Sequence, residues 1–533
     1  MAYKKYLIKF VTDYLLTISA LRVGIGITFL CVVVNVINPP FLQRLELACY
    51  DLRLTARGMV SPLDKVVLVA IDEKSLDEVG RWPWPRTRIA EIIDRLTEDG
   101  AKVIGFDMVF PEPDENRILR EVALIKKEIN ELRVKNEQLD SYLTHLTETA
   151  DPDKVLAEAV KRSGRVILGY FFHRDAAVAG HIPEQKKEEN FGNIVFSSYP
   201  VKFTSPGAAT VQFEKAFAAE ANLKLLSDAA KGSGYFNVFP DPDGVVRKVP
   251  LITSCQDEFF SPLSLRMLYL YFGEEPLLTI EERGVRGIWI GGSEIPTNEK
   301  GEMLINYRGK QKTFPHYSAT DILHGRIKPQ VFKNKIVLVG GTAIGLFDLR
   351  AIPLESVFPG PEIHANIIDT ILQKDFIRRP QWFGGVEYIV IAVVGILFSL
   401  VLPRFRALFG FMGALGFVIL YIFADQYFFR SLRVWLSIVY PILTIVLVYI
   451  GITLYRYMTE EREKAKVRGA FSVYVTPSVV DEMLKNPEKL KLGGEKKELT
   501  VLFSDIRGFT TISENLPPDE LVKFLNEYLT AMT

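Results

Sequence analysis

The sequence predicts an α/β domain outside a membrane, four membrane-spanning helices and the start of a second α/β domain. Three observations support this fold class. Four long apolar runs bracket a polar stretch, residues 39–380. Inside that stretch, buried-strand patterns alternate with amphipathic helix patterns. After the last apolar run, a short apolar segment ends in an acid and leads into a second helix pattern.

The overall composition excludes several classes of protein. Of 533 residues, 48% are hydrophobic and 24% are charged, and 64 basic side chains balance 64 acidic ones. A disordered chain would carry few apolar residues and a high net charge. Attachment to nucleic acid needs clustered positive charge, so we expect no nucleic-acid partner. The mean hydropathy of +0.14 is high for a wholly soluble protein and favours membrane segments.

Cysteines and histidines give little sign of a structural site. Three cysteines in so long a chain exclude a disulfide scaffold, although one Cys49–Cys255 bridge stays open outside the cytoplasm. Cys31 lies in an apolar run and is interpreted as a small buried or lipid-facing residue. The six histidines show no zinc-like spacing, so no structural zinc site is expected.

The first apolar run, residues 14–38, predicts transmembrane helix 1. No residue is charged from Val23 to Gln43, and about 20 apolar residues span a bilayer. Arg22 suits the cytoplasmic interface, where its long side chain can reach water. Lysines in residues 1–13 place that segment in the cytoplasm. A cleaved signal peptide is the alternative, but no small-residue cleavage site follows.

Three further apolar runs predict transmembrane helices 2, 3 and 4, at residues 386–402, 407–424 and 434–455. Arg404 and Arg406 lie after the first of them and favour the cytoplasmic side. If successive helices cross the membrane in alternating directions, residues 39–380 lie outside the cytoplasm and the C-terminal part lies inside it. We therefore expect a multi-pass protein in a lipid bilayer.

The outer domain begins with a strand–helix–strand pattern. Residues 66–72 form a continuous apolar run, as in a strand buried on both faces. Pro85 suits a helix start, and an apolar face follows before Gly100. Residues 102–110 read as the second strand, so the pattern predicts a parallel sheet covered by helices.

Two later segments extend this domain. The residues DPDG at 241–244 predict a hairpin turn between YFNVF and VVRKVPLI. The residues KIVLVG at 335–340 predict another buried strand, followed by a helix from about Pro361 to Gln373.

Two features of these strands could bind a ligand. The loop GGTAIG after the strand at 335–340 lacks the Lys-Ser/Thr of a phosphate loop, which favours a plain turn. Asp72 and Asp107 close their strands at the edge where ligands often bind in α/β sheets. They could equally be turn-forming residues.

Residues 115–150 carry a sustained heptad pattern. The apolar positions follow one another at intervals of four and three residues, with Asn136 as the single polar member. A polar seam residue of this kind specifies register and oligomeric state. The preferred interpretation is a self-associating coiled coil, and the alternative is a seam that packs on its own domain. The seam comprises Ile118, Val122, Ile125, Ile129, Leu132, Asn136, Leu139, Leu143 and Leu146.

Several blocks together resemble the type-two CHASE group of extracellular sensors, over about residues 45–380. The blocks are YDLR (50–53), VLVAIDEKSLDEVGRWPWPR (67–86), KVIGFDMVFPEPD (102–114), DPDGVVRKVPL (241–251), NYRG (306–309), and the stretch from KIVLVGG to NIIDTIL (335–372). The resemblance implies an α/β sensor domain with the heptad stretch as an insertion. It does not identify the sensor's ligand.

The cytoplasmic part starts with a charged helix from Arg456 to Gly469, within a linker over residues 456–494. This helix continues the last membrane helix and is the covalent route for a signal. The segment LTVLFSD at 499–505 predicts a strand ending in Asp505, and Gly508 and Thr510 follow before a helix from about Pro517. A carboxylate at that corner suits a metal–phosphate site, although many strand-end aspartates only start turns.

The string LGGEKKELTVLFSDIRGFTTISENLPPDELVKFLNEYLTAM resembles the opening of a class III nucleotidyl cyclase domain, which is a ferredoxin-like α/β fold. The resemblance assigns residues 495–533 to that domain. It implies that the Asp505 carboxylate and the Ile506 carbonyl bind Mg²⁺ or Mn²⁺, with two ions in the complete enzyme. It also implies that Gly508, Phe509 and Thr510 line the nucleotide triphosphate. The family converts ATP to cyclic AMP and pyrophosphate at a homodimer interface.

The resemblance therefore implies a bacterial receptor adenylate cyclase of the inner membrane. The second metal aspartate, the base-selecting residues and the transition-state Asn/Arg pair belong to later strands, so we expect residues 1–533 alone to be inactive. A guanylate cyclase, or a sensor and dimerisation module without catalysis, stays open. A diguanylate cyclase is disfavoured because Gly493 and Gly494 precede the strand. A kinase is disfavoured because no Gly-rich loop with a strand lysine follows the membrane block.

Overall fold

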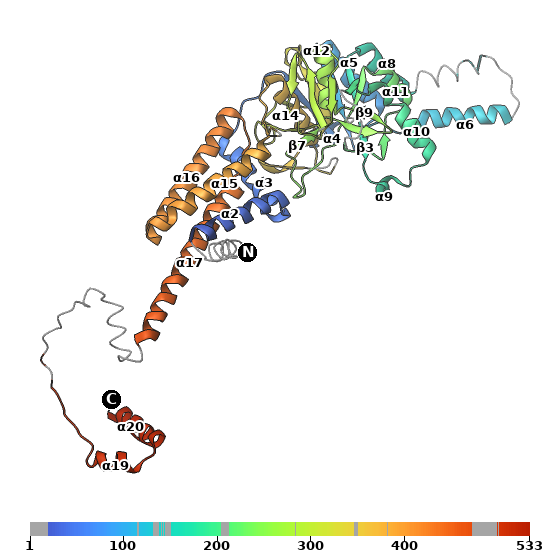
Figure 1. Ribbon diagram of the computed structural model, residues 1–533. Coiled ribbons are helices and arrows are strands. Elements are labelled where there is room, and N and C mark those ends of the chain that lie inside the picture. The colour runs from blue at the N-terminus through green and yellow to red at the C-terminus, as the bar shows by residue number, and fades with distance from the viewer. Residues whose placement is uncertain are drawn as a thin grey trace, which may run out of the picture. The chain divides into compact units, whose positions relative to one another are not determined.

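The computed structural model describes residues 20–114, 117–131, 151–203, 213–282, 284–345, 350–380, 382–471 and 500–532, with single residues at 138, 139, 141, 143 and 498. The chain divides into two compact units, residues 1–456 and 457–533, and each is described by itself. Figure 1 shows the first unit as a mixed α/β domain joined to long helices.

The α/β domain is built on a seven-stranded sheet, in which all neighbours pair in parallel except β3 and β5. The predicted parallel sheet is therefore confirmed. Strand β15 comes late in the chain but lies between β1 and β2, which places the two strands of the first βαβ pattern on either side of it. In spatial order the strands are β14 (His316–Ser318), β1 (Val66–Ile71), β15 (Ile336–Gly341), β2 (Val103–Asp107), β3 (Val166–His173) and β5 (Ala218–Glu220), with β6 (Gly232–Tyr235) also paired to β3.

Helices cover both faces of this sheet because its strands are apolar on both sides. Along β1, Val66 and Leu68 enter one core, whereas Val67, Val69 and Ile71 enter the other. One face carries α4 (Glu73–Val79), α5 (Arg86–Glu98), α8 (Pro152–Ser163), α11 (Lys224–Ala229) and α13 (Ala319–Leu323). The other carries α12 (Leu263–Phe272) and α14 (Gly360–Gln373).

Smaller sheets extend the domain beside α12 and α14. The largest joins β4 (Val201–Phe203), β10 (Leu277–Glu281), β11 (Gly284–Ile290) and β12 (Ser293–Ile295). Three two-stranded sheets pair β7 (Lys248–Pro250) with β13 (Glu302–Leu304), β8 (Thr253–Cys255) with β9 (Glu258–Phe260), and β16 (Arg350–Ile352) with β17 (Glu355–Phe358). Two short helices, α9 (Ala176–Ala179) and α10 (Glu184–Gly192), complete the described domain.

The predicted hairpin around residues 241–244 is wrong, although its turn is present. The Asp241 N–H donates to the Val245 carbonyl and the Gly244 N–H to the Asp241 carbonyl. The flanking strands separate, because β6 joins the central sheet while β7 pairs with β13. The turn signal was local, whereas the strand partners were set by distant segments.

The heptad insertion is described only in part. Helix α6 (Arg117–Glu131) confirms a helix over its first half, and Val122 is buried while Ile125 is exposed. Asn136, Leu132 and Leu146 lie outside the described residues. Self-association of this seam stays a prediction.

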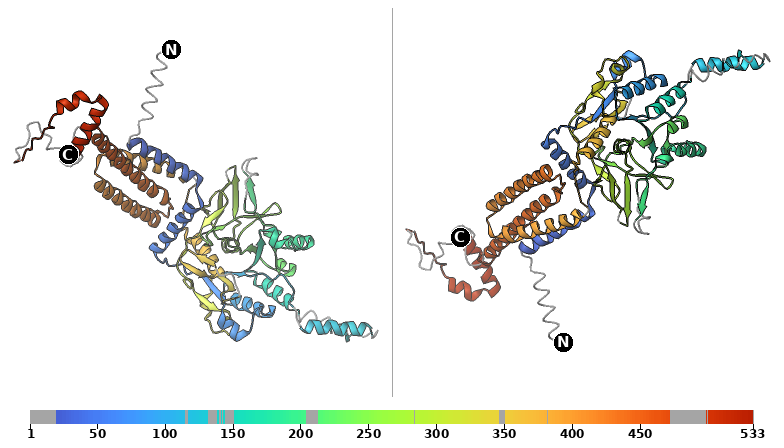
Figure 2. Two further views of the ribbon diagram at one scale, coloured as in Figure 1. Left: turned by 90° about the horizontal axis from the view of Figure 1, so that it is seen from below. Right: turned by 90° about the horizontal axis from the view of Figure 1, so that it is seen from above.

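Among the described residues, four helices are long and apolar enough to cross a membrane, and we call them the apolar bundle. They pack together through residues such as Phe398, Ala414 and Val448, and both views in Figure 2 show them side by side. Their bounds are α2 (Ala20–Ile37), α15 (Phe383–Val401), α16 (Ala407–Leu432) and α17 (Val439–Phe471).

Two of the bundle helices differ from the predicted boundaries. Helix α16 continues past the predicted end at 424, because Asp425 is buried and paired rather than exposed at a helix end. Helix α17 begins at Val439, not 434, because Val434 pairs with Arg378 in an isolated bridge. Helix α17 also continues through the predicted charged helix after Arg456.

Helices α2 and α15 cross closely at two glycines, which makes them a sensitive contact. A Cβ on Gly395 would lie 2.2 Å from Thr28 Oγ1, and one on Gly24 would lie 2.2 Å from Ser399 Oγ. Gly395→Ala should therefore push the helices apart and destabilise the bundle by about 1–3 kcal/mol, the usual cost of overpacking. Thermal unfolding in detergent measures this. Gly413→Ala is the matched control, because nothing lies within 4 Å of its added Cβ.

In the second unit, the predicted strand at 499–505 is not formed. Thr500 to Asp505 carry no strand, and Val501, Leu502 and Phe503 are 67%, 81% and 92% exposed. A strand needs a partner for its backbone hydrogen bonds, and none of the described residues pairs with this segment. Helices α19 (Phe509–Asn515) and α20 (Pro518–Met532) follow, so the helix predicted after Pro517 is confirmed.

Candidate functional site

Helix α3 (Pro40–Arg57) joins α2 of the apolar bundle to the α/β domain, and its contacts form the candidate site. The chain turns at Asn38, whose φ of 48° is left-handed, and Pro39 and Pro40 then start the helix. One face of α3 is buried, and it comprises Glu46, Leu47, Tyr50, Arg53 and Leu54. The spacing of these residues is that of a single helical face.

The charged residues of this face hold the ends of two bundle helices. Arg53 Nε donates to Asp425 Oδ2 of α16 at 2.6 Å, and its Nη2 lies 3.4 Å from Glu46 Oε1. Both partners of Arg53 are buried. Buried charges of this kind are stable only when each one is paired and hydrogen-bonded.

Glu46 also holds the start of α17. Its carboxylate accepts hydrogen bonds from the backbone N–H of Ile438 at 3.1 Å and of Val439 at 3.0 Å, and from Trp435 Nε1 at 3.2 Å. The first N–H groups of a helix lack partners inside the helix, and a carboxylate there also interacts favourably with the helix dipole. Helix α3 therefore supplies the N-terminal cap of α17 from a distant part of the chain.

Tyr50 lies on the same buried face of α3 as Glu46 and Arg53. Its ring is fully buried and lies 4.8 Å from that of Trp435 and 5.9 Å from that of Phe429, measured between centroids. Leu47, Leu54 and Ile377 complete this small apolar cluster. The cluster holds α3, the end of α16 and the loop before α17 as one packed group.

On its other side, α3 is joined to the α/β domain by Asp51. Arg247 donates to both Asp51 oxygens, at 2.7 and 2.6 Å, and also pairs with Asp241 and Asp243 of the DPDG turn. Burial opposes the charge on Arg247, but its ion pairs with Asp51 and Asp243 outweigh that effect and raise its pKa. The turn predicted at 241–244 thus serves to present two carboxylates to this arginine.

Arg57, at the last turn of α3, reaches the NYRG segment. It donates to the Asn306 side-chain oxygen and to the Tyr307 carbonyl. Burial lowers the pKa of Arg57 to about 10. The guanidinium still carries its charge at neutral pH.

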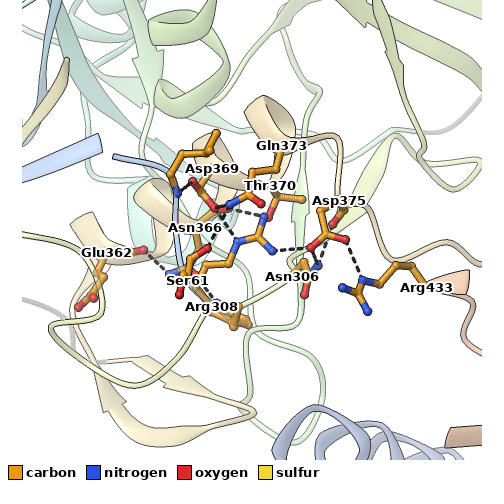
Figure 3. Close-up of polar contacts among 12 residues, drawn as sticks. Ser61, Asn306, Arg308, Glu362, Asn366, Asp369, Thr370, Gln373, Asp375 and Arg433 are labelled. Carbon is orange, nitrogen blue, oxygen red and sulfur yellow. Dashed lines mark hydrogen bonds and ion pairs between the residues drawn. The ribbon is translucent and has the colours of Figure 1, made fainter. Parts of the chain in front are cut away.

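A buried network around Arg308 connects α14 to the loop between α16 and α17 (Figure 3). Arg308 Nε lies 2.6 Å from Asp369 Oδ2, and its Nη1 lies 2.7 Å from Asp375 Oδ2. Asp375 Oδ1 accepts from Arg433 Nε at 2.8 Å. Burial opposes ionisation of Asp375, but Arg433 and Arg308 outweigh it and lower its pKa.

Backbone hydrogen bonds join the segment after α14 to the loop between α16 and α17. The Arg378 N–H donates to the Arg433 carbonyl at 2.7 Å, and the Trp435 N–H donates to the Arg378 carbonyl at 3.0 Å. We call the whole set of contacts the coupling layer. It comprises Glu46, Tyr50, Asp51, Arg53 and Arg57 of α3, Arg247, Asn306, Arg308, Asp369 and Asp375 of the α/β domain, Asp425 of α16, Arg433, Trp435 and Ile438 of the loop before α17, and Val439 of α17.

Sequence reasoning quoted YDLR and NYRG as family blocks but gave their residues no role. Two signals could have found the coupling layer. An acid inside an apolar helix, such as Asp425, is costly and implies a buried partner. The spacing of Glu46, Tyr50 and Arg53 also marks one helical face.

The metal–phosphate corner predicted from the sequence lies in the second unit. Asp505 is exposed, and the Ile506 carbonyl accepts the Phe509 N–H at 3.1 Å. Gly508, at φ 75°, is the N-cap of α19, and Phe509 and Thr510 form its first turn. The structure therefore brings these five residues together in one turn at a helix start.

The donor atoms of this turn suit the predicted metal but form only part of a site. A carboxylate and a carbonyl are the hard oxygen ligands that Mg²⁺ and Mn²⁺ prefer. Across the described residues, no three His, Cys, Asp or Glu side chains are grouped to hold a metal ion.

The other candidate ligand features of the α/β domain prove largely structural. Asp72 caps α4, accepting from the Ser75 N–H at 2.9 Å and from the Ser318 hydroxyl. The loop after β15 is a plain turn, because the N–H groups of Thr342 and Ala343 donate to the Ile71 carbonyl. Cys49 and Cys255 are both free, so the possible bridge between them is absent.

Asp107 differs, since its side chain has no hydrogen-bond or ion-pair partner among the described residues. Burial raises its pKa to about 7, from an ordinary value of 3.8. The folded protein therefore holds this proton more tightly than the unfolded chain, and the stability present below pH 3.8 is lost as the pH rises to 7.

Asp107→Asn should remove this loss. At pH 8 the variant should be more stable than the wild type by up to about 4 kcal/mol, because one pKa unit corresponds to about 1.4 kcal/mol. At pH 4 the two should be nearly equal. Thermal unfolding at both pH values measures the difference, and an equal offset at both would contradict the assignment.

Comparison with known proteins identifies the family of most of the chain. The CHASE2 domain matches residues 27–401, which include the α/β domain, α3 and α15. No solved structure matches the chain.

Matches to curated proteins are short. An adenylate cyclase of Anabaena cylindrica is 44% identical over 46 residues, which are 8% of this chain and 9% of that protein. Uncharacterized proteins of Mycobacterium bovis and Mycobacterium tuberculosis are each 37% identical over 67 residues, 13% of this chain and 12% of theirs. The chain thus spans about a tenth of the length of these relatives. Because the CHASE2 match covers well over half of the sequence, this chain belongs to the CHASE2 domain family.

Proposed function

We propose that this chain is the sensing and membrane part of a receptor adenylate cyclase. The observation that carries the proposal is the joining of a CHASE2 domain, through the coupling layer, to the start of α17. Helix α17 then runs without a break from Val439 to Phe471, toward the cyclase-like string. The similarity to an adenylate cyclase of Anabaena cylindrica supports the choice of reaction.

In this proposal the apolar bundle crosses a bacterial inner membrane. Residues 1–13 and the part after α17 lie in the cytoplasm, and the α/β domain lies outside. Basic residues at Arg404, Arg406 and Arg456 support this orientation, because short cytoplasmic segments are enriched in lysine and arginine. Arg430 and Arg433, on the outer side, are used in contacts with Ala56 and Asp375.

The signal travels as a change in the packing of α17. A ligand or dimer rearrangement that shifts α14 or α3 acts on Arg433 in the loop before α17, through Asp375, or on the Glu46 cap at Val439. Couplings of about 1–3 kcal/mol between two sites change affinity or activity by 5- to 150-fold. A homodimer is proposed because class III catalytic sites form between two domains.

The catalytic residues are proposed from the turn at Asp505. The Asp505 carboxylate and the Ile506 carbonyl would hold Mg²⁺ or Mn²⁺, and the amides of Gly508, Phe509 and Thr510 would face the triphosphate of ATP. Bound metal would favour attack of the ribose 3′-hydroxyl on the α-phosphorus and stabilise the leaving pyrophosphate.

The test is a cyclase assay of the full reading frame with ATP or GTP and with Mg²⁺ or Mn²⁺. We expect cyclic AMP from ATP, and a loss of at least about 100-fold in Asp505→Ala, the scale seen when one charge-stabilising group is removed. Asp519→Ala is the matched control, since it removes an exposed acid from the nearby first turn of α20. Cyclic GMP as the product would favour a guanylate cyclase. No product at all would favour a sensor and dimerisation module.

A further inference from the structure

A large groove lies where the α/β domain meets the ends of the apolar bundle. Its volume is about 1010 Å³, which lies at the upper limit for small-molecule sites in proteins. One wall comes from β11 and β12, and the other from the segment between α14 and α15. Trp435 and residues near the start of α3 also line the groove. Arg247 and Trp435 of the coupling layer line part of the groove, whereas its remaining lining has no role in the functions described above.

The charges that line the groove are unevenly paired. Three of its cations are already neutralised, because Arg247 pairs with Asp241, Lys248 with Glu302, and Arg286 with Glu281.

Lys374 and Arg378 differ from those cations. Both are exposed, and their side chains have no hydrogen-bond or ion-pair partner among the described residues. The Thr297 hydroxyl is buried in the same lining and likewise lacks a partner there. Two free cations and a free hydroxyl are suitable partners for a phosphate group.

Three tryptophans line the groove. Trp382 directly precedes α15 and is 66% exposed, Trp435 lies between α16 and α17, and Trp289 of β11 is 46% exposed. Tryptophan is enriched where membrane proteins meet the lipid head groups. Because Arg378 and Trp382 come just before the first apolar turn of α15, a phosphate bound by them would lie at head-group depth, with its acyl chains still in the bilayer.

We infer that this groove binds the phosphate of an anionic phospholipid of the outer leaflet, through Lys374 and Arg378. The bound lipid joins β11 and β12 to the segment that carries Asp375, and Asp375 holds Arg433 of the coupling layer. Occupancy of the groove therefore sets the position of the loop before α17. This inference rests on the membrane arrangement proposed above but not on cyclase activity.

The test measures binding of short-chain phosphatidylglycerol, below its micelle concentration, to the detergent-solubilised chain by calorimetry. The Lys374→Gln/Arg378→Gln variant should bind at least tenfold more weakly than the wild type. The matched control is Lys154→Gln/Lys328→Gln, which removes two exposed lysines outside the groove and should bind as the wild type does. Equal melting temperatures without lipid will show that the variants fold.

The same experiment with sn-glycerol 1-phosphate and with inorganic phosphate separates a lipid from a soluble anion. Both probes should bind at least tenfold more weakly than the lipid. Equal binding of either probe, or wild-type lipid binding by the Lys374→Gln/Arg378→Gln variant, would overturn the inference. Flotation of the chain with vesicles tests the membrane arrangement separately. Because no nucleotide is used in these experiments, their outcome does not depend on whether the cyclase proposal holds.

Discussion

Replacing Arg308 with methionine is expected to destabilise the protein by about 3–5 kcal/mol, the cost of breaking a buried ion pair from one side. Asp369 is fully buried, and it would keep its charge with only Gln373 and the Leu63 N–H as hydrogen-bond donors. Of its two arginine partners, Asp375 would keep only Arg433. Thermal unfolding of the purified chain in detergent measures the effect.

The double variant Arg308→Met/Asp369→Leu is the informative control. Replacing both members of a buried pair with apolar residues is often close to neutral, because no uncompensated charge remains. We therefore expect the double variant to recover most of the lost stability. If it is no more stable than Arg308→Met, the loss comes from packing and not from the unpaired carboxylate.

Glu46→Ala is expected to have the second large effect, a loss of about 3 kcal/mol or more. The N–H groups of Ile438 and Val439 and the indole of Trp435 would lose their shared acceptor, and each buried donor left unpaired costs about 1–3 kcal/mol. The first turn of α17 should then fray. Hydrogen exchange should accelerate at residues 438–442 while the amides of β1 and β15 keep their protection.

Arg44→Ala provides the comparison on the same helix, because Arg44 is exposed and outside the buried face of α3. It should leave exchange at 438–442 unchanged. In the full reading frame, Glu46→Ala should also weaken regulation by the sensor while leaving basal catalysis intact. Unchanged exchange in Glu46→Ala would remove the cap from the proposed signal route.

Much of the architecture was predictable because it depends on short-range patterns. The strands at 66–71, 103–107 and 336–341 are runs of apolar residues that only a sheet covered on both faces can bury. The bundle helices are runs of apolar residues long enough to satisfy their own backbone in lipid. Neither pattern needs knowledge of what lies opposite it.

The errors occurred where a partner from a distant part of the chain decides the structure. The end of α16 was placed at 424 because the uncharged run stops there, whereas the ion pair between Asp425 and Arg53 allows the helix to continue. The turn at 241–244 joins no hairpin because Arg247 gathers its carboxylates while β7 pairs elsewhere. Helix α3 was not predicted at all, although one buried face identifies it afterwards.

By itself, the sequence determined the α/β class of the first domain and the four apolar helices, whereas the role of residues 505–510 stays a prediction. The tertiary structure alone decided which charges meet. The main partners of Asp425, Glu46, Arg308 and Asp375 lie far away in sequence, so the order of residues along the chain does not reveal them. A buried charge is tolerated only beside its counter-charge, and that pairing depends on how the α/β domain and the bundle pack together.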